Sequence, residues 1–329
     1  MTDKEKYRDW CNEQADIPVF MQPWWLDAVC AGKEWDVMLW EEADVESNLN
    51  AAEDLPEQVQ VSHIVAAMPY LIRKRYRIRY VLMPQQTQTG GVWIREDKRS
   101  DTALQTRIAD DIVERLHAMK LSYYYQQFPI DSPFPEMLRE RGFRIKQRVS
   151  YRIEDLEDLD KVMNSFSKNK RRQLQKALTM SVDEEMEVED FYRFHTACLQ
   201  QQGKTITYTR EFLLVLYMKA SRLGQCRIVR IKTANGETSA AAFVVWDKKS
   251  LYYLIPCYSP EFKDSGAGAL LVWESIKLAR RLGLEFDFEG SMIRGVANHY
   301  KQFGSVPAIY YGVRKSYNPL FSLYIRLRG

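Results

Sequence analysis

The amino-acid sequence predicts an α/β (α+β) protein with two domains of one plan, each a mixed, mostly antiparallel central sheet flanked by helices. The main observation is a repeated order of elements. In both halves of the chain, strands lead into a loop, a helix, a strand, a short helix and a closing strand. The length of 329 residues is sufficient for two domains. We expect residues 1–153 to form the first domain and residues 154–329 the second.

Composition narrows the class of protein. The apolar content of 46% is ordinary for a globular protein, and the formal net charge of +3 is too small for a chain that binds polyanions over its whole surface. The five cysteines are scattered and include no Cys-x-x-Cys pair, which predicts a reducing compartment, the cytoplasm. The four histidines are isolated in the sequence, so no metal site is expected. The N-terminus lacks the apolar stretch of a signal peptide, and no run approaches the roughly 18 apolar residues of a membrane span.

The first half of the chain is predicted to contain five strands and two helices. The expected strands are residues 35–40, 63–73, 78–83, 122–128 and 143–153, and the expected helices are residues 101–119 and a short segment that ends at Gly142. Residues 41–60 interrupt the first pair of strands with seven acidic side chains and neither lysine nor arginine. This composition is typical of an exposed, mobile loop.

The second half has stronger local signals. Asn235-Gly236 is a turn signal between two stretches of strand-forming residues, 226–232 and 239–246, and it predicts a hairpin. Further strands are expected at 251–258, 284–288 and 308–314, and a short helix at 296–302. Three helical segments, at 159–179, 188–202 and 209–224, connect the two halves.

A glycine-bearing loop joins the strand at 251–258 to a helix that ends at Gly283. The loop consists of Lys263, Asp264, Ser265, Gly266, Ala267, Gly268 and Ala269. Such a loop points backbone N–H groups at the start of a helix, where the helix dipole also favours negative charge, so it suits a phosphate or pyrophosphate. The dinucleotide fingerprint G-x-G-x-x-G is not matched, because Leu271 occupies its third glycine position. The alternative interpretation is an ordinary helix start in an α/β unit.

Two clusters of cations are further candidates for binding phosphate. The first lies on the predicted helix at 159–179 and comprises Lys168, Lys170, Arg171, Arg172 and Lys176. The second, residues 73–79, lies at a strand end and a turn and includes Arg73 and Arg75. Arginine binds phosphate through two hydrogen bonds at once, so these clusters suit a polyanionic substrate such as a nucleotide-linked sugar or a tRNA backbone. A solvated charged surface is the alternative for both clusters.

Several of these motifs resemble those of a known family. Residues 263–269, with the pattern K-x-x-G-x-G-A, resemble the Q/R-x-x-G-x-G/A loop that cradles the pyrophosphate of acyl-CoA in GNAT acyltransferases. Residues 167–177, SKNKRRQLQKA, resemble the N-x-R-R-x-I-x-K-A segment that opens the second domain of FemAB-like proteins. The resemblance covers nearly the whole chain, because FMQPWWL at 20–26, MPY at 68–70, MP at 83–84 with TG at 89–90, and FDFEGS at 286–291 also match.

The resemblance implies tandem duplicated GNAT-like domains, with the phosphate-loop motif in the second domain. FemAB-like proteins include aminoacyltransferases that add amino acids from aminoacyl-tRNA to peptidoglycan precursors, and uncharacterised bacterial relatives, which this chain resembles most. The implied donor is acyl-CoA or aminoacyl-tRNA, with no tightly bound cofactor. The implied acceptor is an amine on a small molecule or a cell-wall precursor. Transfer RNA is therefore a candidate partner, and no DNA partner is implied.

The C-terminal region departs from the family pattern. The peptidoglycan enzymes carry a lysine in an F-K-x-x-F/W-G segment, whereas residues 299–304 of this chain, HYKQFG, are one residue short of it. Alignment on the final Phe-Gly places Tyr300 at the lysine position, and alignment on the lysine places Lys301 there. The long coiled-coil arm that some of those transferases use is not found in this sequence.

Acyl transfer to an amine requires an anchored donor, a group that takes the proton of the amine, and a hydrogen-bond donor for the carbonyl oxyanion. Glu289 is the candidate for the general base or for orienting the amine, and strand alternation is expected to place it on the same face as Asp287. Its alternative role is to hold the turn at Gly290 and Ser291. The candidate proton donors are Tyr253, Tyr258 and Tyr300, and the candidate ligands of an oxyanion or a phosphate are His299 and Lys301.

We therefore expect an acyltransferase or aminoacyltransferase that acts on an amine. Two alternatives remain at this point: a catalytically inactive GNAT-fold protein that binds its ligand without turnover, and an RNA-binding protein that uses the two basic clusters. RNA binding would require an affinity that falls steeply with salt. The small net charge and the lack of an RNA-binding sequence motif disfavour it.

Overall fold

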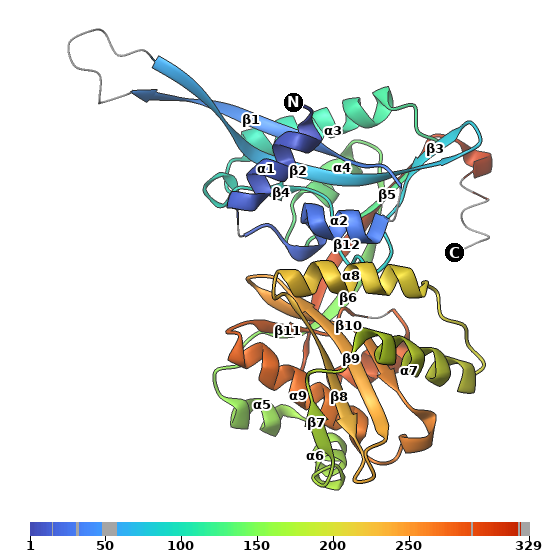
Figure 1. Cartoon of the computed structure of the whole chain (residues 1–329). Coiled ribbons are helices and arrows are strands. Elements are labelled where there is room, and N and C mark those ends of the chain that lie inside the picture. The colour runs from blue at the N-terminus through green and yellow to red at the C-terminus, as the bar shows by residue number, and fades with distance from the viewer. Residues whose placement is uncertain (15, 31–32, 48–57, 291, 322, 324–329) are drawn as a thin grey trace. The chain divides into compact units, whose positions relative to one another are not determined.

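The computed structural model describes residues 1–14, 16–30, 33–47, 58–290, 292–321 and 323 (Figure 1). The chain forms two compact units, and neither is continuous in sequence. Unit 1 comprises residues 1–17, 32–147 and 311–329, and unit 2 comprises residues 18–31 and 148–310. This division differs from the expected boundary at residue 153, because an early segment belongs to unit 2 and the C-terminal segment belongs to unit 1.

Unit 1 contains a sheet in the order β1-β2-β3-β5-β12, with the short strand β4 paired to β2. Neighbouring strands are antiparallel except β3 and β5, which are parallel. Its strands are β1 (Trp35–Ser47), β2 (Gln58–Arg75), β3 (Ile78–Val81), β4 (Trp93–Ile94), β5 (Tyr123–Phe128) and the C-terminal part of β12 (Val306–Ser316). Its helices are α1 (Asp3–Glu13), α3 (Thr102–Ala118) and α4 (Phe134–Glu140), with a 3₁₀ turn, η2, at Glu96–Lys98.

Unit 2 contains a sheet in the order β6-β11-β10-β9-β8-β7, in which only β10 and β11 are parallel. Its strands are β6 (Arg144–Ile153), β7 (Ser181–Asp183), β8 (Cys226–Lys232), β9 (Thr238–Trp246), β10 (Ser250–Tyr258) and β11 (Glu285–Asp287). Its helices are α2 (Pro23–Cys30), α5 (Leu159–Ser165), α6 (Lys168–Lys176), α7 (Val188–Gln201), α8 (Arg210–Arg222), α9 (Ala267–Arg281) and α10 (Arg294–Lys301), with 3₁₀ turns η1 (Val19–Met21) and η3 (Pro260–Phe262).

Each unit has its own hydrophobic core, which explains why both are stable assemblies of helices on a sheet. In unit 1, the face of α3 that carries Leu104, Ile108 and Ile112 is buried, at the spacing that one side of a helix requires. In unit 2, α9 is apolar on most of its surface, and ten of its residues are buried, including Leu271 and Ile276. The predicted α/β class and mixed, mostly antiparallel sheets are confirmed.

A buried carboxylate, that of Asp247, binds the segment that begins at Pro18 to the rest of unit 2. Asp247, at the end of β9, accepts hydrogen bonds from the backbone N–H of Val19 at 3.1 Å and from the hydroxyl of Tyr252 at 3.0 Å. The rings of Phe20 and Tyr252 also pack with their centroids 4.7 Å apart. Conversely, Tyr311 to Ser316 pair with β5, which places the end of the chain in unit 1. Contacts between residues far apart in sequence therefore decide the unit to which each segment belongs.

Two local predictions need correction. The helix expected at 159–179 is two helices, because Phe166 is extended (ψ 143°) and the Ser167 side chain caps the start of α6 by accepting from the Lys170 N–H. The expected loop at 41–60 is shorter, because β1 continues to Ser47 and β2 begins at Gln58. The rest of that prediction, residues 48–57, lies outside the described residues. Among the described residues, no helix is both long enough and apolar enough to cross a membrane.

Candidate phosphate-binding and acyl-transfer site

The glycine loop begins α9 in the way the sequence predicts. Gly266 is the N-cap residue and has a left-handed backbone (φ +87°), and no side chain caps the helix start. A Cβ atom on Gly266 would lie 2.0 Å from the carbonyl oxygen of Gln173, so only glycine fits against α6. A Cβ atom on Gly268 would lie 3.2 Å from the ring of Tyr258. The start of α9 is therefore closely packed on its sides, and the Ala267 and Ala269 N–H groups donate to the Ser265 hydroxyl and the Gly266 carbonyl.

A cavity of about 280 Å³ lies at this helix start. Residues from five elements (α6, β9, β10, α9 and α10) and the loop after β10 line it, and none of them is acidic. The lining residues are Lys170, Gln173, Ser239, Tyr258, Ser259, Phe262, Lys263, Gly266, Ala267, Gly268, Ala269 and His299. The structure thus brings Lys170 of the first basic cluster to the predicted phosphate loop. Asp264 and Ser265 belong to the same loop but do not line the cavity, and the Ser265 hydroxyl instead accepts from the Ala267 N–H at 3.2 Å.

Lys170 differs from the other cations of α6 because its side chain is buried, with 4% of its surface exposed. Its ammonium donates to Oε1 of Gln173 at 3.1 Å and to Nδ1 of His299 at 3.2 Å, and it lies 4.9 Å from the centre of the Phe303 ring. No carboxylate forms an ion pair with it among the residues that the structure describes. Burial lowers the pKa of Lys170 to about 8.

His299 is held in one protonation form by Lys170. Burial, and secondarily the charge of Lys170, lower the pKa of His299 to about 4, so the ring is neutral at pH 7. Because an ammonium can only donate, Nδ1 is the acceptor and the single ring proton is on Nε2. Nε2 is buried and has no hydrogen-bond partner in the described part of the chain. A hydrogen-bond donor is therefore available beside the cavity.

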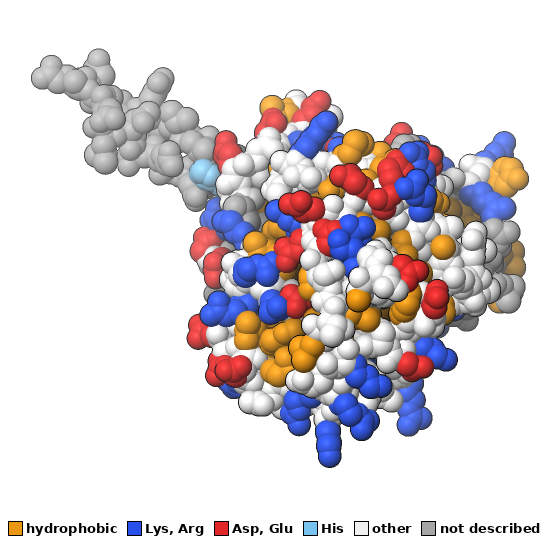
Figure 2. Space-filling model, turned by 60° about the horizontal axis from the view of Figure 1, so that its bottom comes forward, with side chains coloured by type: hydrophobic (Ala, Val, Ile, Leu, Met, Phe, Trp, Pro, Cys, Tyr) orange, Lys and Arg blue, Asp and Glu red, His pale blue; other side chains and the backbone are white. Residues whose placement is uncertain are grey.

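The remaining cations of α6 lie at the surface. Lys168, Arg172 and Lys176 are exposed, and Arg171 is half-buried and donates to the carbonyl of Asn164 at 2.8 Å. Figure 2, which brings the lower end of Figure 1 forward, shows Lys and Arg side chains along the lower edge of the molecule. The predicted cluster is thus divided into one buried ammonium and a basic surface.

The second group of predicted residues surrounds the end of β11. Asp287 is fully buried and accepts from the Ser150 hydroxyl at 2.5 Å, from Nε of Arg152 at 2.6 Å and from the Glu289 N–H at 2.7 Å. β11 ends at Asp287, and Glu289 has a left-handed backbone (φ +60°). Strand alternation therefore does not position Glu289, although its carboxyl is close enough to Asp287 for that charge to raise its pKa. Asp287 holds the turn by accepting the Glu289 N–H.

Glu289 has the features of a functional acid. A non-glycine residue with positive φ is uncommon and indicates a local constraint. Its Oε1 atom is buried without a hydrogen-bond partner in the described part of the chain. Burial, and then the neighbouring charge of Asp287, raise the pKa of Glu289 well above its ordinary value. Buried acids with such shifts are frequent at active sites.

Three tyrosines lie between the cavity and Glu289. The hydroxyls of Tyr258, which lines the cavity, and of Tyr253 are 3.0 Å apart. Tyr300 stacks on Phe288 with ring centroids 4.5 Å apart. The pKa of Tyr300 is raised to about 12, first by burial and then by the charge of Glu289, while Tyr300 in turn contributes to the raised pKa values of Tyr253 and Tyr258. These electrostatic influences indicate that the four side chains are neighbours.

Other predicted residues lie elsewhere. Lys301 is exposed, with its ammonium 5.8 Å from the centre of the Tyr151 ring, and it does not line the cavity. Arg73 and Arg75 belong to unit 1, at the end of β2, where they pair in register with Tyr80 and Ile78. The structure does not bring these three residues to the cavity. Their binding roles stay predictions.

The sequence analysis missed four lining residues: Gln173, Ser239, Ser259 and Phe262. Gln173 had a signal, because it lies three residues after Lys170 on a helix, where side chains are neighbours. Ser259 and Phe262 directly precede the glycine loop. Ser239 comes from β9, and only the pairing of β9 with β10 brings it to the cavity.

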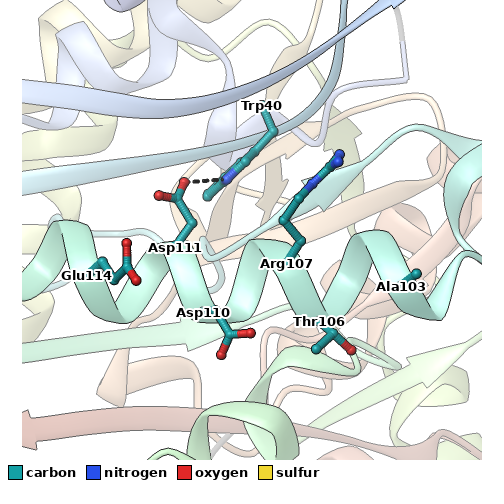
Figure 3. Close-up of a pocket in the computed structure, with 7 residues that line it drawn as sticks. All are labelled: Trp40, Ala103, Thr106, Arg107, Asp110, Asp111 and Glu114. Atoms are coloured by element: carbon teal, nitrogen blue, oxygen red, sulfur yellow. Dashed lines mark hydrogen bonds between the residues drawn. The ribbon is translucent and has the colours of Figure 1, made fainter.

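Unit 1 has a different hollow, over α3 (Figure 3). Figure 3 shows Asp110, Asp111 and Glu114 projecting from α3 around it. Asp111 accepts from the Trp40 indole at 2.7 Å and pairs with Arg115, and Asp110 pairs with Arg141 at 2.6 Å. This acidic lining does not suit a phosphate-bearing donor.

Comparisons with known proteins identify a domain family for part of the chain and similar solved structures for nearly all of it. Residues 139–302 match the model of the "Acetyltransferase (GNAT) domain" family, a range that includes the cavity and Glu289. Among solved structures, FemX is similar over 98% of both chains (TM-score 0.65, 13% identity). L-PGS from Bacillus licheniformis is similar over 95% of this chain and 92% of its own (TM-score 0.52, 13% identity). A tandem GNAT protein from the clavulanic acid biosynthesis pathway is similar over 96% of both chains (TM-score 0.51, 11% identity). No curated protein matches the chain.

The structural likeness over nearly the whole length confirms the duplicated fold, and the family match covers the unit that carries the glycine loop. Residues 139–302 are therefore similar to the acetyltransferase (GNAT) domain family, and the chain has the fold of these solved structures, a tandem GNAT protein among them.

Proposed function

We propose that this protein transfers an acyl or aminoacyl group from a phosphate-bearing donor, acyl-CoA or aminoacyl-tRNA, to an amine. The observation that supports it best is the start of α9, which has a glycine N-cap and a cavity without acidic residues. A helix start of this kind favours a phosphate through its dipole and through the N–H of Gly268. Both donors carry phosphates, so the shared chemistry is a phosphoryl group at α9.

Glu289 is the proposed general base. The amine nitrogen attacks the carbonyl carbon, a C–N bond forms, and the bond from that carbon to the thioester sulfur or ester oxygen breaks. The proton of the amine passes to Glu289, and the leaving sulfur or oxygen takes up a proton. Because burial raises the pKa of Glu289, its ionised form is a stronger base than an ordinary carboxylate. Tyr253 and Tyr300 are the proposed proton donors.

The acceptor carries a primary amine, and the likeness to FemAB-like proteins supports a cell-wall precursor as the compound that bears it. The exposed cations Arg172 and Lys301, with the half-buried Arg171, are proposed to contact the charged groups of this acceptor. Arg73 and Arg75 of unit 1 are proposed as additional contacts for a polyanionic acceptor or a tRNA.

Thermal stabilisation by donors tests the phosphate site. A ligand that binds only the folded state raises the melting temperature by mass action. We expect CoA or acetyl-CoA to raise the melting temperature of the wild type but not of Gly268→Asp, because that side chain would enter the cavity beside Tyr258. Gly295→Asp is the matched control, since no atom lies within 4 Å of a Cβ at that position.

The same assay separates the two donors. A shift with CoA compounds that Gly268→Asp abolishes and Gly295→Asp retains identifies acyl-CoA as the donor class. A shift only with aminoacyl-tRNA assigns the site to that donor. Transfer to an amine is measured as the release of thiol or of deacylated tRNA. Binding of either donor without this release would contradict the catalytic part of the proposal and leave a ligand-binding protein.

A further inference from the structure

Exposed apolar side chains gather at one edge of the sheet of unit 1. Tyr76, in the turn between β2 and β3, is 93% exposed, and Leu320 and Leu323, which follow β12, are 81% and 55% exposed. Tyr76 also has a left-handed backbone (φ +54°), which is unfavourable for a bulky side chain. Single exposed apolar residues are ordinary, but several of them together indicate a contact surface.

This edge is assembled by contacts between segments that are distant in sequence. β3 and β5 are parallel, with Tyr80 opposite Tyr123, so the turn before β3 and the start of β5 lie at the same end of the sheet. The ring of Phe321 packs against that of Tyr80 with the centroids 4.9 Å apart, which places the C-terminal segment beside β3 (Figure 1). The N–H of Asn318 also donates to the carbonyl of Ser122 at 3.1 Å.

A cavity of about 520 Å³ lies at the same edge, and its charged lining residues are all cations: Arg144, Arg314 and Lys315. Arg144 begins β6, and the other two lie near the end of β12. Neither arginine forms an ion pair with a carboxylate in the described part of the chain. The Lys315 ammonium donates to the carbonyl of Gly142 at 2.8 Å, a neutral group. Leu323 lines the cavity as well, so apolar and cationic side chains meet there.

The acidic residues of these segments do not neutralise the cations. Glu34 pairs with Lys74 at 3.0 Å, close to the turn between β2 and β3. Glu140, at the end of α4, is exposed but does not line the cavity. In the turn itself, Arg77 is exposed and has no carboxylate partner among the residues that the structure describes. The edge therefore combines positive charge with exposed apolar side chains.

The apolar side chains decide between the two large anionic surfaces that attract cations, lipid and nucleic acid. A nucleic acid is bound through arginine, lysine and aromatic rings, and an exposed leucine gains little from a phosphate backbone. The interface of a bilayer takes up leucine and is enriched in tyrosine, and anionic lipids attract arginine and lysine. Leu320 and Leu323 beside the cations therefore favour lipid.

We propose that this edge of unit 1 docks the protein onto an anionic phospholipid bilayer. A lipid phosphate binds in the cavity between Arg144 and Arg314, while Tyr76, Leu320 and Leu323 enter the interfacial layer. The contact is peripheral, because only a few side chains enter the bilayer. The cavity in unit 1 shares no residue with the cavity at α9 in unit 2, so docking does not depend on the proposed acyl transfer.

Sedimentation with vesicles tests the docking, with the full chain and no acyl donor. We expect the wild type to bind vesicles of phosphatidylcholine mixed with phosphatidylglycerol and not vesicles of phosphatidylcholine alone. Arg144→Gln combined with Arg314→Gln should weaken binding at least about tenfold, because each cation near an anionic surface contributes about fivefold. The charge-matched control, Lys204→Gln combined with Arg222→Gln, changes two exposed cations of unit 2 and should bind as the wild type does.

The apolar contribution has its own variants. Leu323→Ser should weaken vesicle binding at least about threefold, because burial of the side chain in the interface is lost. Leu223→Ser is the matched control, since Leu223 of unit 2 is 54% exposed, almost the same as Leu323. Tyr76→Asn should also weaken binding, and asparagine tolerates the left-handed backbone of the turn.

Two results would overturn the proposal. The first is a wild type that does not bind the phosphatidylglycerol vesicles, or an arginine variant that binds them as its charge-matched control does. Arg144→Gln alone, which changes an exposed side chain, decides the matter if the double variant does not fold. The second is binding of single-stranded RNA, but not of vesicles, that the arginine variant loses and Leu323→Ser retains. That result would make the edge a nucleic-acid surface.

Discussion

The helices α3 and α9 occupy the same place in the order of elements of their units, but they begin differently. α3 is capped by Asp101, whose carboxylate accepts the Leu104 N–H at 2.8 Å. α9 is capped by Gly266, which has no side chain to accept from the first turn. In unit 1 the chain's own carboxylate thus occupies the position that a bound anion would take. Gly266 provides no such carboxylate, and we propose that a phosphate takes this position in unit 2.

The side chains around the two helices also differ in charge. The hollow over α3 is lined by Asp110, Asp111 and Glu114 (Figure 3), whereas the cavity at α9 contains Lys170 and Lys263 and no acid. The turns after the following strands also differ. Asp131 and Glu289 both have positive φ, at +62° and +60°, yet Asp131 is exposed while Glu289 has a buried carboxyl oxygen.

The largest expected effect is on the rate of catalysis, and it is tested by changing Glu289 and Asp131 in turn. Glu289→Gln should lower kcat about 10²- to 10⁴-fold, because the amine loses its proton acceptor. Asp131→Asn, the matched change in unit 1, should leave kcat unchanged. The measurement is steady-state acyl transfer to an amine under saturating donor. Equal activity of Glu289→Gln and the wild type would contradict the role of unit 2 as the catalytic repeat.

The raised pKa of Glu289 also predicts the stability of that variant. The folded state holds the proton of this carboxyl more tightly than the unfolded state, so its contribution to stability is present at low pH and is lost as the pH rises above about 4.5. Glu289→Gln should therefore be more stable than the wild type at pH 7, as measured by denaturant unfolding. A less stable variant would indicate that the ionised carboxylate is a structural group.

The next effect concerns the packing of the α9 start. Gly266→Ala should lower the free energy of unfolding by about 4 kcal/mol, since it adds the strain of a positive φ to a backbone clash. Gly236→Ala is the control, because Gly236 has φ +84° but no atom within 4 Å of a Cβ. It should show only the strain of roughly 1–2 kcal/mol. Equal losses in the two variants would mean that α6 is not packed against the glycine loop.

The third prediction concerns pH and Lys170. Its pKa is lowered from 10.5 to about 8 in the folded state, so between these values the unfolded state binds more protons and stability increases with pH. The difference corresponds to a gain of at most about 3 kcal/mol for the protein without ligand. Lys170→Met should lack this gain, and Lys176→Met should retain it. Urea unfolding at pH 7.5, 9 and 10.5 measures it, provided both variants are compared with the wild type at each pH.

The smallest effect tests the start of α3. Asp101→Ala should lower the free energy of unfolding by about 1 kcal/mol through loss of the cap, and Asp101→Ser should recover most of it. Neither variant is expected to bind a second pyrophosphate at α3, because the surroundings of α3 are acidic, so the number of sites measured by calorimetry should equal that of the wild type. An additional site in Asp101→Ala would show that a free helix start is sufficient, and the contrast between the two units would then depend on the cap alone.

Local signals predicted much of this molecule because they act over a few residues. The apolar spacing along α3 and α9, the Asn235-Gly236 turn and the glycine loop all involve neighbours in sequence, and the elements they predict are present. The positive φ of Gly266 is likewise a local property, because glycine adopts a left-handed backbone without steric cost. Strand alternation did not predict the position of Glu289, because β11 is only three residues long and ends at Asp287, whose carboxylate is taken up by Ser150 and Arg152.

The sequence by itself determined the duplicated plan, the phosphate-type loop and the candidate acid Glu289, since these depend on spacing, glycine and residue type. Only the tertiary structure decided that Lys170, among five cations of one helix, is buried. That outcome requires His299 and Phe303, which lie about 130 residues further along the chain, to pack against α6. The same holds for residues 18–31, which the buried Asp247 binds to unit 2. Burial and charge pairing depend on contacts between distant segments, and no local pattern encodes them.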